Sequence, residues 1–401
     1  MSAVMNWRGQ PFRSEDGEAA MRKYEIDRAT ILRLGEELGI DGIGVTTAEP
    51  FHDVHEHLVM YRESGHESGF EHDVLEERVD PKAFFPEAKS IVAIAMAYRT
   101  EKYAGQKKPE GLRGQMSVYA WGMDYHKVLK AKLELLAARL EQEAGRPIAV
   151  HNSVDTGPLV DRAVAQRAGI GWVGKNCSLI TEKHGSWVFL GQLVCDVDIE
   201  PSEPSLLPQC EDCPDLCLKA CPTKALVNPF QTDSSKCLSY ITQMKGLIPL
   251  EYRAKLGRRL WGCDTCQVVC PKNREVAFGT AIEFDPEPEY AFPDLMRLLT
   301  LSNKQFRREF GESAAAWRGA KVMQRNAIIA LGNMREQAAL PKLLEMLEQD
   351  ERREIRGTIA WALQKIDPEG TRALVAAAYA REPDEEIRQE MAWAVEEAPE
   401  A

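Results

Sequence analysis

Two hydrophobic patterns alternate along the first half of the chain. Apolar residues recur at three- and four-residue steps over residues 24–38, which predicts an amphipathic helix that ends at Gly39. The apolar stretch at residues 43–45 predicts the strand that follows. Residues 90–98 form a continuous apolar run, which is typical of a strand buried on both faces. We therefore expect a mixed domain of helices and strands around a buried central strand.

The alternation continues after this strand. Residues 99–117 are rich in glycine, lysine and glutamine and predict a surface loop. A long amphipathic helix is predicted after Asp124, whose side chain can cap it. Further strands are predicted at residues 148–150 and 187–194, with a helix at residues 159–168 between them.

The last third of the chain contains an internal repeat. Similar segments begin at Arg325, Arg356 and Arg388, at intervals of 31 and 32 residues, and each ends a unit of two amphipathic helices. This spacing is typical of short HEAT-like repeats, which stack into one long surface, usually for a macromolecule. Basic residues at the start of this region predict a stripe that binds a phosphate backbone: Lys304, Arg307, Arg308, Arg318, Lys321 and Arg325. The alternative is an ordinary solvated charged face.

The composition is that of an ordinary soluble globular protein, with 44% hydrophobic and 28% charged residues. A chain of 401 residues is long enough for two or three domains. The net charge of −12 argues against indiscriminate nucleic-acid binding, although it allows a local basic face. Neither a membrane-spanning apolar run nor a cleavable leader is recognisable, so we expect a cytoplasmic protein without a membrane partner.

Eight of the ten cysteines lie at residues 210–270, in two groups that each end in Cys-Pro. Such groups are typical of proteins that bind two [4Fe–4S] clusters, in which the cysteine before proline ligates the other cluster. Zinc or a disulfide framework is the alternative, but two Cys-Pro endings fit zinc poorly and nothing marks the chain as secreted. The pattern assigns one cluster to Cys210, Cys213, Cys217 and Cys270, and the other to Cys221, Cys237, Cys263 and Cys266.

A glycine-rich stretch at residues 169–176 suggests backbone that lies close to a large cofactor. Its spacing fits neither a dinucleotide-binding fingerprint nor a phosphate-binding P-loop. Asp155 precedes this stretch, in a position where it can also cap the next helix.

Four other residues have reactive side chains outside these motifs. Cys177 and Cys195 are expected to be buried small residues. His55 and His57 could bind a metal, but acidic neighbours make a solvated helix face the favoured interpretation.

Together these motifs resemble the epoxyqueuosine reductase family, over nearly all of residues 24–366. The resemblance departs from the family in one place, because three residues rather than two separate Cys213 from Cys217. It rests on five segments: Val154-Asp-Thr-Gly-Pro158, Gly171-Trp-Val-Gly-Lys-Asn176, Cys221-Pro-Thr-Lys-Ala-Leu226, Cys237-Leu-Ser-Tyr240 and Gly262-Cys-Asp-Thr-Cys-Gln-Val-Val-Cys-Pro271.

The resemblance implies an α+β protein related to reductive dehalogenases. Residues 1–20 would be a flexible extension. A nitroreductase-like α/β cobalamin domain would follow at residues 21–205, and a ferredoxin-like domain with two [4Fe–4S] clusters at residues 206–285. The HEAT-like repeats would occupy residues 286–401 and bind tRNA.

The resemblance also implies an enzyme that completes queuosine synthesis in tRNA. Epoxyqueuosine at the wobble position would lose its epoxide oxygen in a two-electron reduction, using cobalamin fed by the two clusters. Asp155 matches the family motif for the proton donor, and an apolar site under the corrin would raise its pKa. The residues expected to hold the corrin, beside Asp155 itself, are Arg78, Lys175, Ser178, Gln192, Ser239 and Gln267.

The expected partners follow from the same resemblance. The repeats would bind the anticodon stem-loop, and a flavodoxin or ferredoxin system would supply electrons to a monomeric enzyme. Two other functions fit the motifs: a reductive dehalogenase-like corrinoid enzyme for a small molecule, and a non-catalytic, cluster-bearing tRNA-binding protein.

Overall fold

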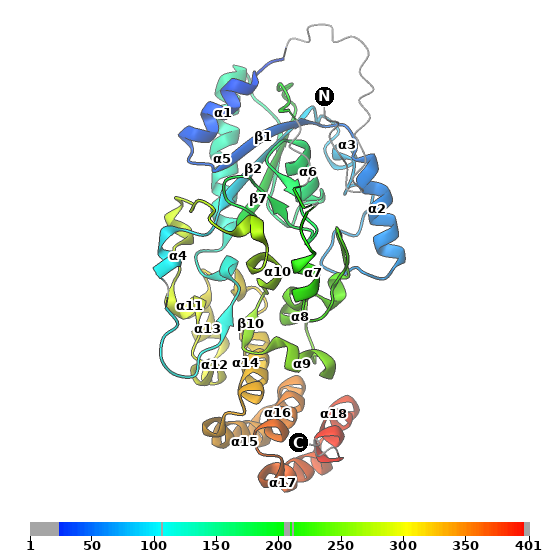
Figure 1. Cartoon of the computed structure of the whole chain (residues 1–401), viewed down its shortest axis with the longest axis vertical. Helices are drawn as coiled ribbons and strands as arrows, with labels where there is room; N and C mark the ends of the chain where they lie inside the picture. Colours follow the sequence, from blue (N-terminus) through cyan, green and yellow to red (C-terminus); the bar gives the residue numbers. More distant parts are fainter. Residues whose placement is uncertain (1–23, 106, 204–208, 211, 397–401) are drawn as a thin grey trace. The chain divides into compact units, whose positions relative to one another are not determined.

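The computed structural model of the chain describes residues 24–105, 107–203, 209–210 and 212–396. It contains two compact units, and each is assembled from separate stretches of sequence (Figure 1). The first unit comprises Met1–Gly105, Met123–Cys237 and Thr265–Asp285. The second comprises Gln106–Gly122, Leu238–Asp264 and Pro286–Ala401, so residues between the predicted cluster ligands belong to the same unit as the repeats.

The first unit is built on a four-stranded antiparallel sheet with the strand order β1-β2-β7-β4. Figure 1 labels β1, β2 and β7. β2 is the buried central strand that the sequence predicts, and all eight of its residues are buried. β7 pairs with β2 along its whole length, which sets Gln192 opposite Ala93. The four strands are β1 (Gly42–Thr47), β2 (Ser90–Ala97), β4 (Val150–Ser153) and β7 (Val188–Cys195).

Helices cover both faces of this sheet. A side chain added at Gly191 would meet Leu129 and Leu133 of α5, whereas the neighbouring Gln192 contacts Asp161 of α6. Because successive strand residues point to opposite faces, α5 and α6 lie on opposite sides. An apolar core joins α6 and β2 to α2. The covering helices are α2 (His52–Glu63), α5 (Tyr125–Ala144) and α6 (Asp161–Arg167).

Capping side chains explain where two helices begin. Asp124 caps α5 as predicted, because its carboxylate accepts the backbone N–H of His126 at 3.1 Å. α1 (Arg28–Glu37) begins later than the predicted residues 24–38, because Asp27 caps it and accepts the backbone N–H of Thr30 at 2.8 Å.

Some predicted boundaries differ from the structure. The predicted loop at residues 99–117 contains α4 (Glu101–Gly105) and β3 (Gln115–Met116). β3 exists by pairing with β10 (Arg259–Trp261), which lies far along the chain, so no local pattern could indicate it. The other short elements of the first unit are α3 (Pro81–Phe84), β5 (Trp172–Val173), β6 (Leu179–Ile180), α7 (Leu216–Ala220), β8 (Leu226–Asn228), β9 (Gln231–Thr232) and α10 (Thr265–Val268).

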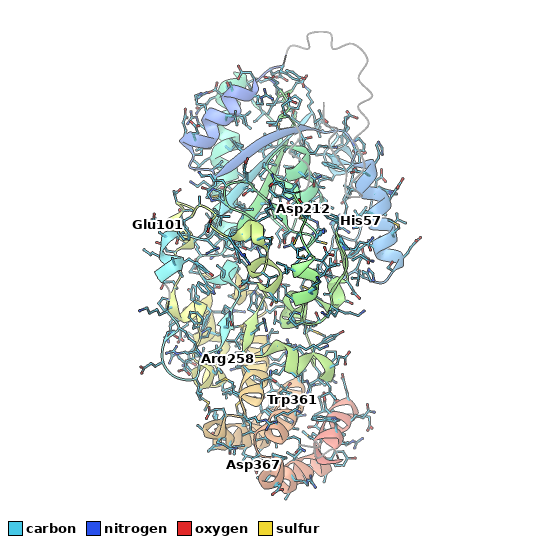
Figure 2. All side chains as sticks on the ribbon, viewed as in Figure 1. His57, Glu101, Asp212, Arg258, Trp361 and Asp367 are labelled. Carbon is cyan, nitrogen blue, oxygen red and sulfur yellow. The ribbon has the colours of Figure 1, made fainter. Side chains whose placement is uncertain are left out.

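The second unit is mainly helical and confirms the predicted repeats. α14 packs against α16 and α16 against α18, and Trp361 of α16 is buried (Figure 2). None of the described helices combines the length and the apolar composition needed to cross a membrane. The helices are α8 (Leu238–Gln243), α9 (Leu250–Leu256), α11 (Pro288–Ala291), α12 (Leu295–Thr300), α13 (Asn303–Phe310), α14 (Ala320–Met334), α15 (Leu340–Gln349), α16 (Arg353–Ile366), α17 (Pro368–Arg381) and α18 (Glu385–Glu396).

Arg325 lies inside this unit, where it is 2% exposed. Its guanidinium donates to the carbonyl oxygens of Met244 and Gly246, both at 2.7 Å. The neighbouring Asn326 donates to the carbonyl oxygen of Thr242, also at 2.7 Å. Placing Arg325 in an exposed basic stripe is therefore wrong, because backbone carbonyls of the second unit bind its charge.

Candidate active site

Asp155 lies at the centre of a tight turn after β4. Its φ of 60° is a left-handed conformation that is uncommon for residues other than glycine. Thr156 donates its backbone N–H to the carbonyl oxygen of Val154 at 2.6 Å, so the three residues form a γ-turn. The alternative that Asp155 caps the next helix is wrong, because Val160 is the N-cap of α6. The turn instead leaves the Asp155 side chain 63% exposed.

Two side chains from the start of α5 contact this carboxylate. The Tyr125 hydroxyl donates to Asp155 Oδ2 at 2.7 Å, and His126 Nε2 lies 3.6 Å from the same oxygen. On its other side His126 Nδ1 lies 2.8 Å from Asp124 Oδ1. The Tyr125 ring stacks on Phe189 of β7, with centroids 4.3 Å apart, which fixes the direction of its hydroxyl.

The two carboxylates beside His126 stabilise the charged form of its imidazole. Burial alone would lower the pKa of His126, but hydrogen bonds to Asp124 and Asp155 raise it to about 9. Burial would raise the pKa of Asp155, but the hydrogen bonds from His126 and Tyr125 lower it. Two donors therefore stabilise the ionised form of Asp155, and the rise in its pKa expected under a bound corrin stays a prediction.

A second carboxyl group, Asp161, is the one whose pKa is raised. It is the first residue of α6, and Gln192 donates from Nε2 to its Oδ1 at 3.1 Å. Burial, followed by the negative charge of Asp155, raises the pKa of Asp161 to about 8. The sequence pattern does not indicate this residue, since an acidic side chain in a first helical turn is common.

Four of the predicted cluster ligands lie close together in the first unit. Cys210 and Cys270 share an apolar cluster with Trp172 and Ile180. Burial and the nearby cysteines Cys213 and Cys270 raise the pKa of Cys217 to about 11. Burial and two nearby cysteines likewise raise the pKa of Cys270. The four are Cys210, Cys213, Cys217 and Cys270, and among the described residues no three His, Cys, Asp or Glu side chains converge closely enough to hold a metal ion. Binding of a [4Fe–4S] cluster would draw these cysteines together and release the thiol protons.

Lys175, a predicted corrin contact, lies beside this cysteine group. Its Nζ donates to Asp215 Oδ1 at 2.7 Å and to the carbonyl oxygen of Cys213 at 3.2 Å. Asp215 has a φ of 58° and is one of the three residues that separate Cys213 from Cys217. The longer spacing is therefore accommodated by a left-handed residue whose side chain binds the ammonium group.

The other predicted ligands are divided between the two units. Cys263 belongs to the second unit, and Cys221, Cys237 and Cys266 belong to the first. Burial would raise the pKa of Cys221, but hydrogen bonds from the Leu226 backbone and from Thr223 lower it. A lowered thiol pKa favours the thiolate that ligates metal.

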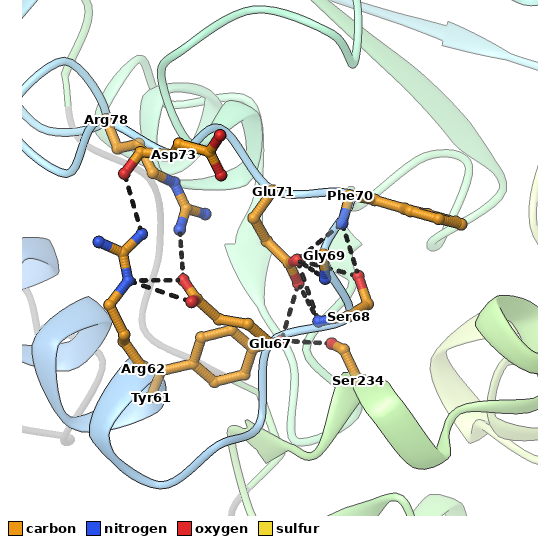
Figure 3. A network of polar contacts seen from close by, with 10 residues as sticks. All are labelled: Tyr61, Arg62, Glu67, Ser68, Gly69, Phe70, Glu71, Asp73, Arg78 and Ser234. Atoms are coloured by element: carbon orange, nitrogen blue, oxygen red, sulfur yellow. Dashed lines mark hydrogen bonds and ion pairs between the residues drawn. The ribbon is translucent and has the colours of Figure 1, made fainter. Parts of the chain in front are cut away.

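Arg78, another predicted corrin contact, belongs to a polar network in the first unit (Figure 3). Its Nη1 lies 3.7 Å from Glu67 Oε1, and Arg62 also binds Glu67. Tyr61 donates to Ser234 Oγ at 2.5 Å in the same network. Among the described residues, the buried Nη1 of Arg78 has no hydrogen-bond partner. Arg78 therefore retains a donor that could bind a ligand.

The remaining predicted corrin contacts differ in their surroundings. Gln267 donates from Nε2 to the Tyr98 hydroxyl at 3.1 Å and to the Ser186 carbonyl at 2.9 Å. The backbone N–H of Ser178 donates to the side chain of Asn176 at 3.3 Å. Ser239 belongs to the second unit, where its carbonyl oxygen accepts hydrogen bonds within α8.

Packing within the chain accounts for two glycines of the predicted cofactor loop. A side chain on Gly171 would come within 2.3 Å of the Ile180 carbonyl oxygen. One on Gly174 would come within 2.5 Å of the Ile180 side chain. Packing against Ile180 of β6 therefore explains these two glycines, and a cofactor close to this stretch stays a prediction.

The isolated cysteines and histidines have ordinary environments. Cys195 is buried as predicted, whereas Cys177 is only partly buried. His55 and His57 lie partly buried on α2, so this face is less solvated than expected; Figure 2 labels His57.

The second unit presents an exposed tryptophan just before α14. Trp317 is 58% exposed, and the Arg318 guanidinium carbon lies 3.7 Å from the centroid of its ring. Trp317 Nε1 donates to Gln243 Oε1 at 3.3 Å, which restrains the ring. α13, which precedes Trp317 in the sequence, carries three exposed cations of the predicted basic stripe: Lys304, Arg307 and Arg308.

Comparisons with known families match three parts of the chain. The family described as epoxyqueuosine reductase QueG, DUF1730, matches residues 78–156, which include Arg78 and Asp155. A 4Fe-4S double cluster binding domain matches residues 209–273, which favours iron–sulfur clusters over zinc. HEAT repeats match residues 315–396.

Individual relatives extend these matches to nearly the whole chain. The epoxyqueuosine reductase of Bacillus cereus is 43% identical over 369 residues, 92% of this chain and 96% of the relative. A crystal structure of epoxyqueuosine reductase with a tRNA-Tyr epoxyqueuosine-modified stem loop is similar, with a TM-score of 0.87 and 43% identity over 92% of this chain and 98% of that one. The structure of epoxyqueuosine reductase from Bacillus subtilis, with its catalytic aspartate loop swung out of the active site, is also similar. Its TM-score is 0.86, with 41% identity over 92% of this chain and 98% of that one. The chain therefore belongs to the epoxyqueuosine reductase family.

Proposed function

We propose that this protein reduces epoxyqueuosine to queuosine at the wobble position of tRNA. The observation that carries this proposal is the 43% identity to an epoxyqueuosine reductase over 92% of the chain. The reaction turns an epoxide into an alkene and releases its oxygen as water, and it consumes two electrons and two protons. The chain must therefore bind a modified tRNA, conduct electrons and deliver protons.

The second unit has features that suit a tRNA stem-loop. A solved relative holds an epoxyqueuosine-modified stem loop. Trp317 offers an exposed ring, backed by Arg318, on which an unpaired base can stack. The exposed cations of α13 can contact phosphates. The anticodon stem-loop is the ligand that we assign to this unit.

Two [4Fe–4S] clusters would conduct the electrons. The double-cluster domain match covers all eight cysteines of the motif. One cluster would be held by Cys210, Cys213, Cys217 and Cys270, whose mutual proximity supports the assignment. The other would be held by Cys221, Cys237, Cys263 and Cys266, an assignment that rests on the order of the motif.

The first unit fits cobalamin, a ligand rich in amide groups. Among the described residues, Arg78 Nη1 and Asn176 Nδ2 are buried donors without hydrogen-bond partners, which is a cost that a polar ligand would remove. When bound, cobalamin supplies a cobalt centre that reduces the epoxide carbon. The residues that would hold it beside Asp155 are Arg78, Lys175, Ser178, Gln192, Ser239 and Gln267.

Asp155 would deliver a proton to the departing oxygen. Its exposed carboxylate can reach a substrate, and the His126 imidazolium 3.6 Å away can supply the proton. A solved relative has its catalytic aspartate loop swung out of the active site. That movement in a relative supports a mobile, proton-delivering role for the Asp155 turn.

Further parts of the proposal rest on the family resemblance. The sheet and helices of the first unit would form a nitroreductase-like fold around the corrin. A flavodoxin or ferredoxin system would reduce the clusters of a monomeric enzyme. The reaction would take place in the cytoplasm, where thiols stay reduced.

The test uses full-length protein that is produced with added cobalamin and purified anaerobically. We expect roughly eight irons per chain from two [4Fe–4S] clusters, together with a corrinoid absorption spectrum. Reduced protein should remove one oxygen atom from an epoxyqueuosine-containing stem-loop, as measured by mass spectrometry. No loss of oxygen by protein that carries all its cofactors would overturn the proposal.

A further inference from the structure

The proposed deoxygenation consumes two protons, and this inference rests on that proposal. When the first C–O bond of the epoxide breaks, the oxygen becomes an alkoxide that takes up one proton. When the second C–O bond breaks, the oxygen leaves as hydroxide and takes up another, while the two electrons from the cofactors complete the alkene. A single carboxyl group such as Asp155 carries one proton at a time, so the second must come from elsewhere.

Two neighbours of Asp155 are suited to hold these protons at neutral pH. His126 lies between Asp124 and Asp155, at 2.8 Å and 3.6 Å, so each of its N–H groups faces a carboxylate. Asp161 is the other, since it accepts a hydrogen bond from Gln192, and burial and the negative charge of Asp155 raise its pKa. It lies six residues further along the chain, where α6 begins.

Gln192 provides an independent sign that Asp161 is protonated. Its Nε2 donates to Asp161 Oδ1 at 3.1 Å, while its Oε1 is buried and has no donor among the described residues. A carboxylic acid can pair with an amide through two hydrogen bonds, because it accepts the N–H and donates its O–H. A carboxylate can only accept, so Asp161 can offer Gln192 Oε1 a donor only when it is protonated.

The same glutamine lies close to the Asp155 turn. A side chain added at Gly157, two residues after Asp155, would come within 3.8 Å of Gln192 Nε2. Gln192 is 1% exposed on β7, so Asp161 and the turn are both held against a rigid strand. This geometry places the second carboxyl group beside the loop that carries the first.

We propose that Asp161 stores the second proton of the reaction and passes it through Asp155 to the departing oxygen. His126 stores the first. After one turnover Asp161 is a carboxylate and His126 is neutral, and both regain protons from solvent through the exposed Asp155. Because Asp161 acts through Asp155, it is a positioning residue and not a catalytic one.

The charges around Asp161 agree with this role. The carboxylate of Asp155 opposes its ionisation, while Arg162 on its own helix and His126 on α5 favour it. Burial is the largest influence, and together these effects set the pKa of Asp161 at about 8. The group therefore holds its proton at neutral pH and can release it when negative charge forms nearby.

The test begins with Asp161→Asn, because asparagine keeps the size of the side chain and can still accept the hydrogen bond from Gln192 Nε2. Infrared spectra of the cofactor-loaded enzyme without tRNA should contain a protonated-carboxyl band that disappears around pH 8, and this band should be absent from D161N. In Asp155→Asn the band should titrate at lower pH, because the neighbouring charge is gone. A spectrum that is identical in wild type and D161N would overturn the proposal.

Single-turnover kinetics supply the second readout. The wild-type rate should fall as pH rises above about 8, whereas D161N should be at least tenfold slower at neutral pH. The rate of D161N should decline only at higher pH, where His126, with a pKa of about 9, loses its proton. D161N should keep the wild-type affinity for the stem-loop, and Asp73→Asn, an exposed aspartate, should behave as wild type. An unchanged pH profile in D161N would contradict the role of Asp161. Absence of turnover in the wild type would instead contradict the proposed function, and the infrared titration would still decide the protonation of Asp161.

Discussion

Tyr125 donates its hydrogen bond to the same carboxylate oxygen of Asp155 that faces His126. Removing the hydroxyl in Tyr125→Phe takes away one of the two donors that lower the pKa of Asp155. We expect that pKa to rise in the variant, as measured by carbon NMR titration of the aspartate carboxyl groups. Tyr379→Phe, on the exposed face of α17, should leave the titration unchanged. A pKa of Asp155 that does not move would show that the hydrogen bond is unimportant.

Asp155→Asn should abolish most turnover while the cofactors stay bound. Asparagine cannot deliver a proton, so we expect the single-turnover rate to fall by about 10² to 10⁴. Iron content and the absorption spectrum should match those of the wild type. Wild-type rates in D155N would remove Asp155 as the proton donor.

The pairing of His126 should make stability depend on pH. The folded-state pKa of about 9 is above the ordinary value of about 6.5, so the imidazolium contributes stability that is fully present below about pH 6.5. That stability is lost as pH rises through about 9. We expect the difference in Tm between wild type and His126→Gln to shrink between about pH 6 and pH 10. The exposed His52, replaced by glutamine, should give no such trend, and a constant difference for H126Q would contradict the assignment.

A buried ion pair should contribute strongly to the stability of the repeats. Arg253 is fully buried and binds Glu390 of α18. Glu390→Gln leaves a buried guanidinium without its charged partner, so we expect a loss of about 3 kcal/mol in the free energy of unfolding, measured in urea. Glu385→Gln breaks an exposed pair with Arg388 on the same helix and should have no measurable effect. Equal effects of the two substitutions would show that burial of the pair is irrelevant.

Trp317→Ala should weaken binding of the stem-loop. Stacking of a base on an aromatic ring contributes about 1–3 kcal/mol, so we expect Kd to rise by about 5-fold to 150-fold. Leu374→Ala, which removes another exposed apolar side chain of the second unit, is the control. Fluorescence anisotropy of a labelled stem-loop measures the Kd of both variants. A Kd of W317A equal to that of the wild type would exclude Trp317 from the interface.

Much of the fold could be predicted from local patterns in the sequence. Three features are visible in short stretches of sequence: the apolar run of β2, the capping residue Asp124 and the arginines that recur in the repeats. β3 could not be predicted, because its partner strand β10 lies far along the chain. The burial of Arg325 could not be predicted either, because the carbonyl groups that accept its hydrogen bonds belong to Met244 and Gly246, about eighty positions earlier.

The site was predictable only in its motif residues. Cysteine spacing indicates the cluster ligands because a cluster demands closely spaced thiolates. The state of Asp155 depends on Tyr125 and His126, which are about thirty positions away, and the pKa of Asp161 depends on burial by the sheet. Protonation is thus a property of the folded site, and a sequence motif alone does not indicate it.

The hydrogen bonds of Arg325 and Asn326 to the backbone after α8 have a practical consequence for protein engineering. Deleting the chain from α14 onward would strip donors from the carbonyl oxygens of Thr242, Met244 and Gly246. Such a deletion would disturb residues adjoining the cysteine motif as well as remove the repeats. A shortened enzyme that fails to act on tRNA would therefore be ambiguous, and grafting these repeats onto another scaffold would require the 238–264 segment to travel with them.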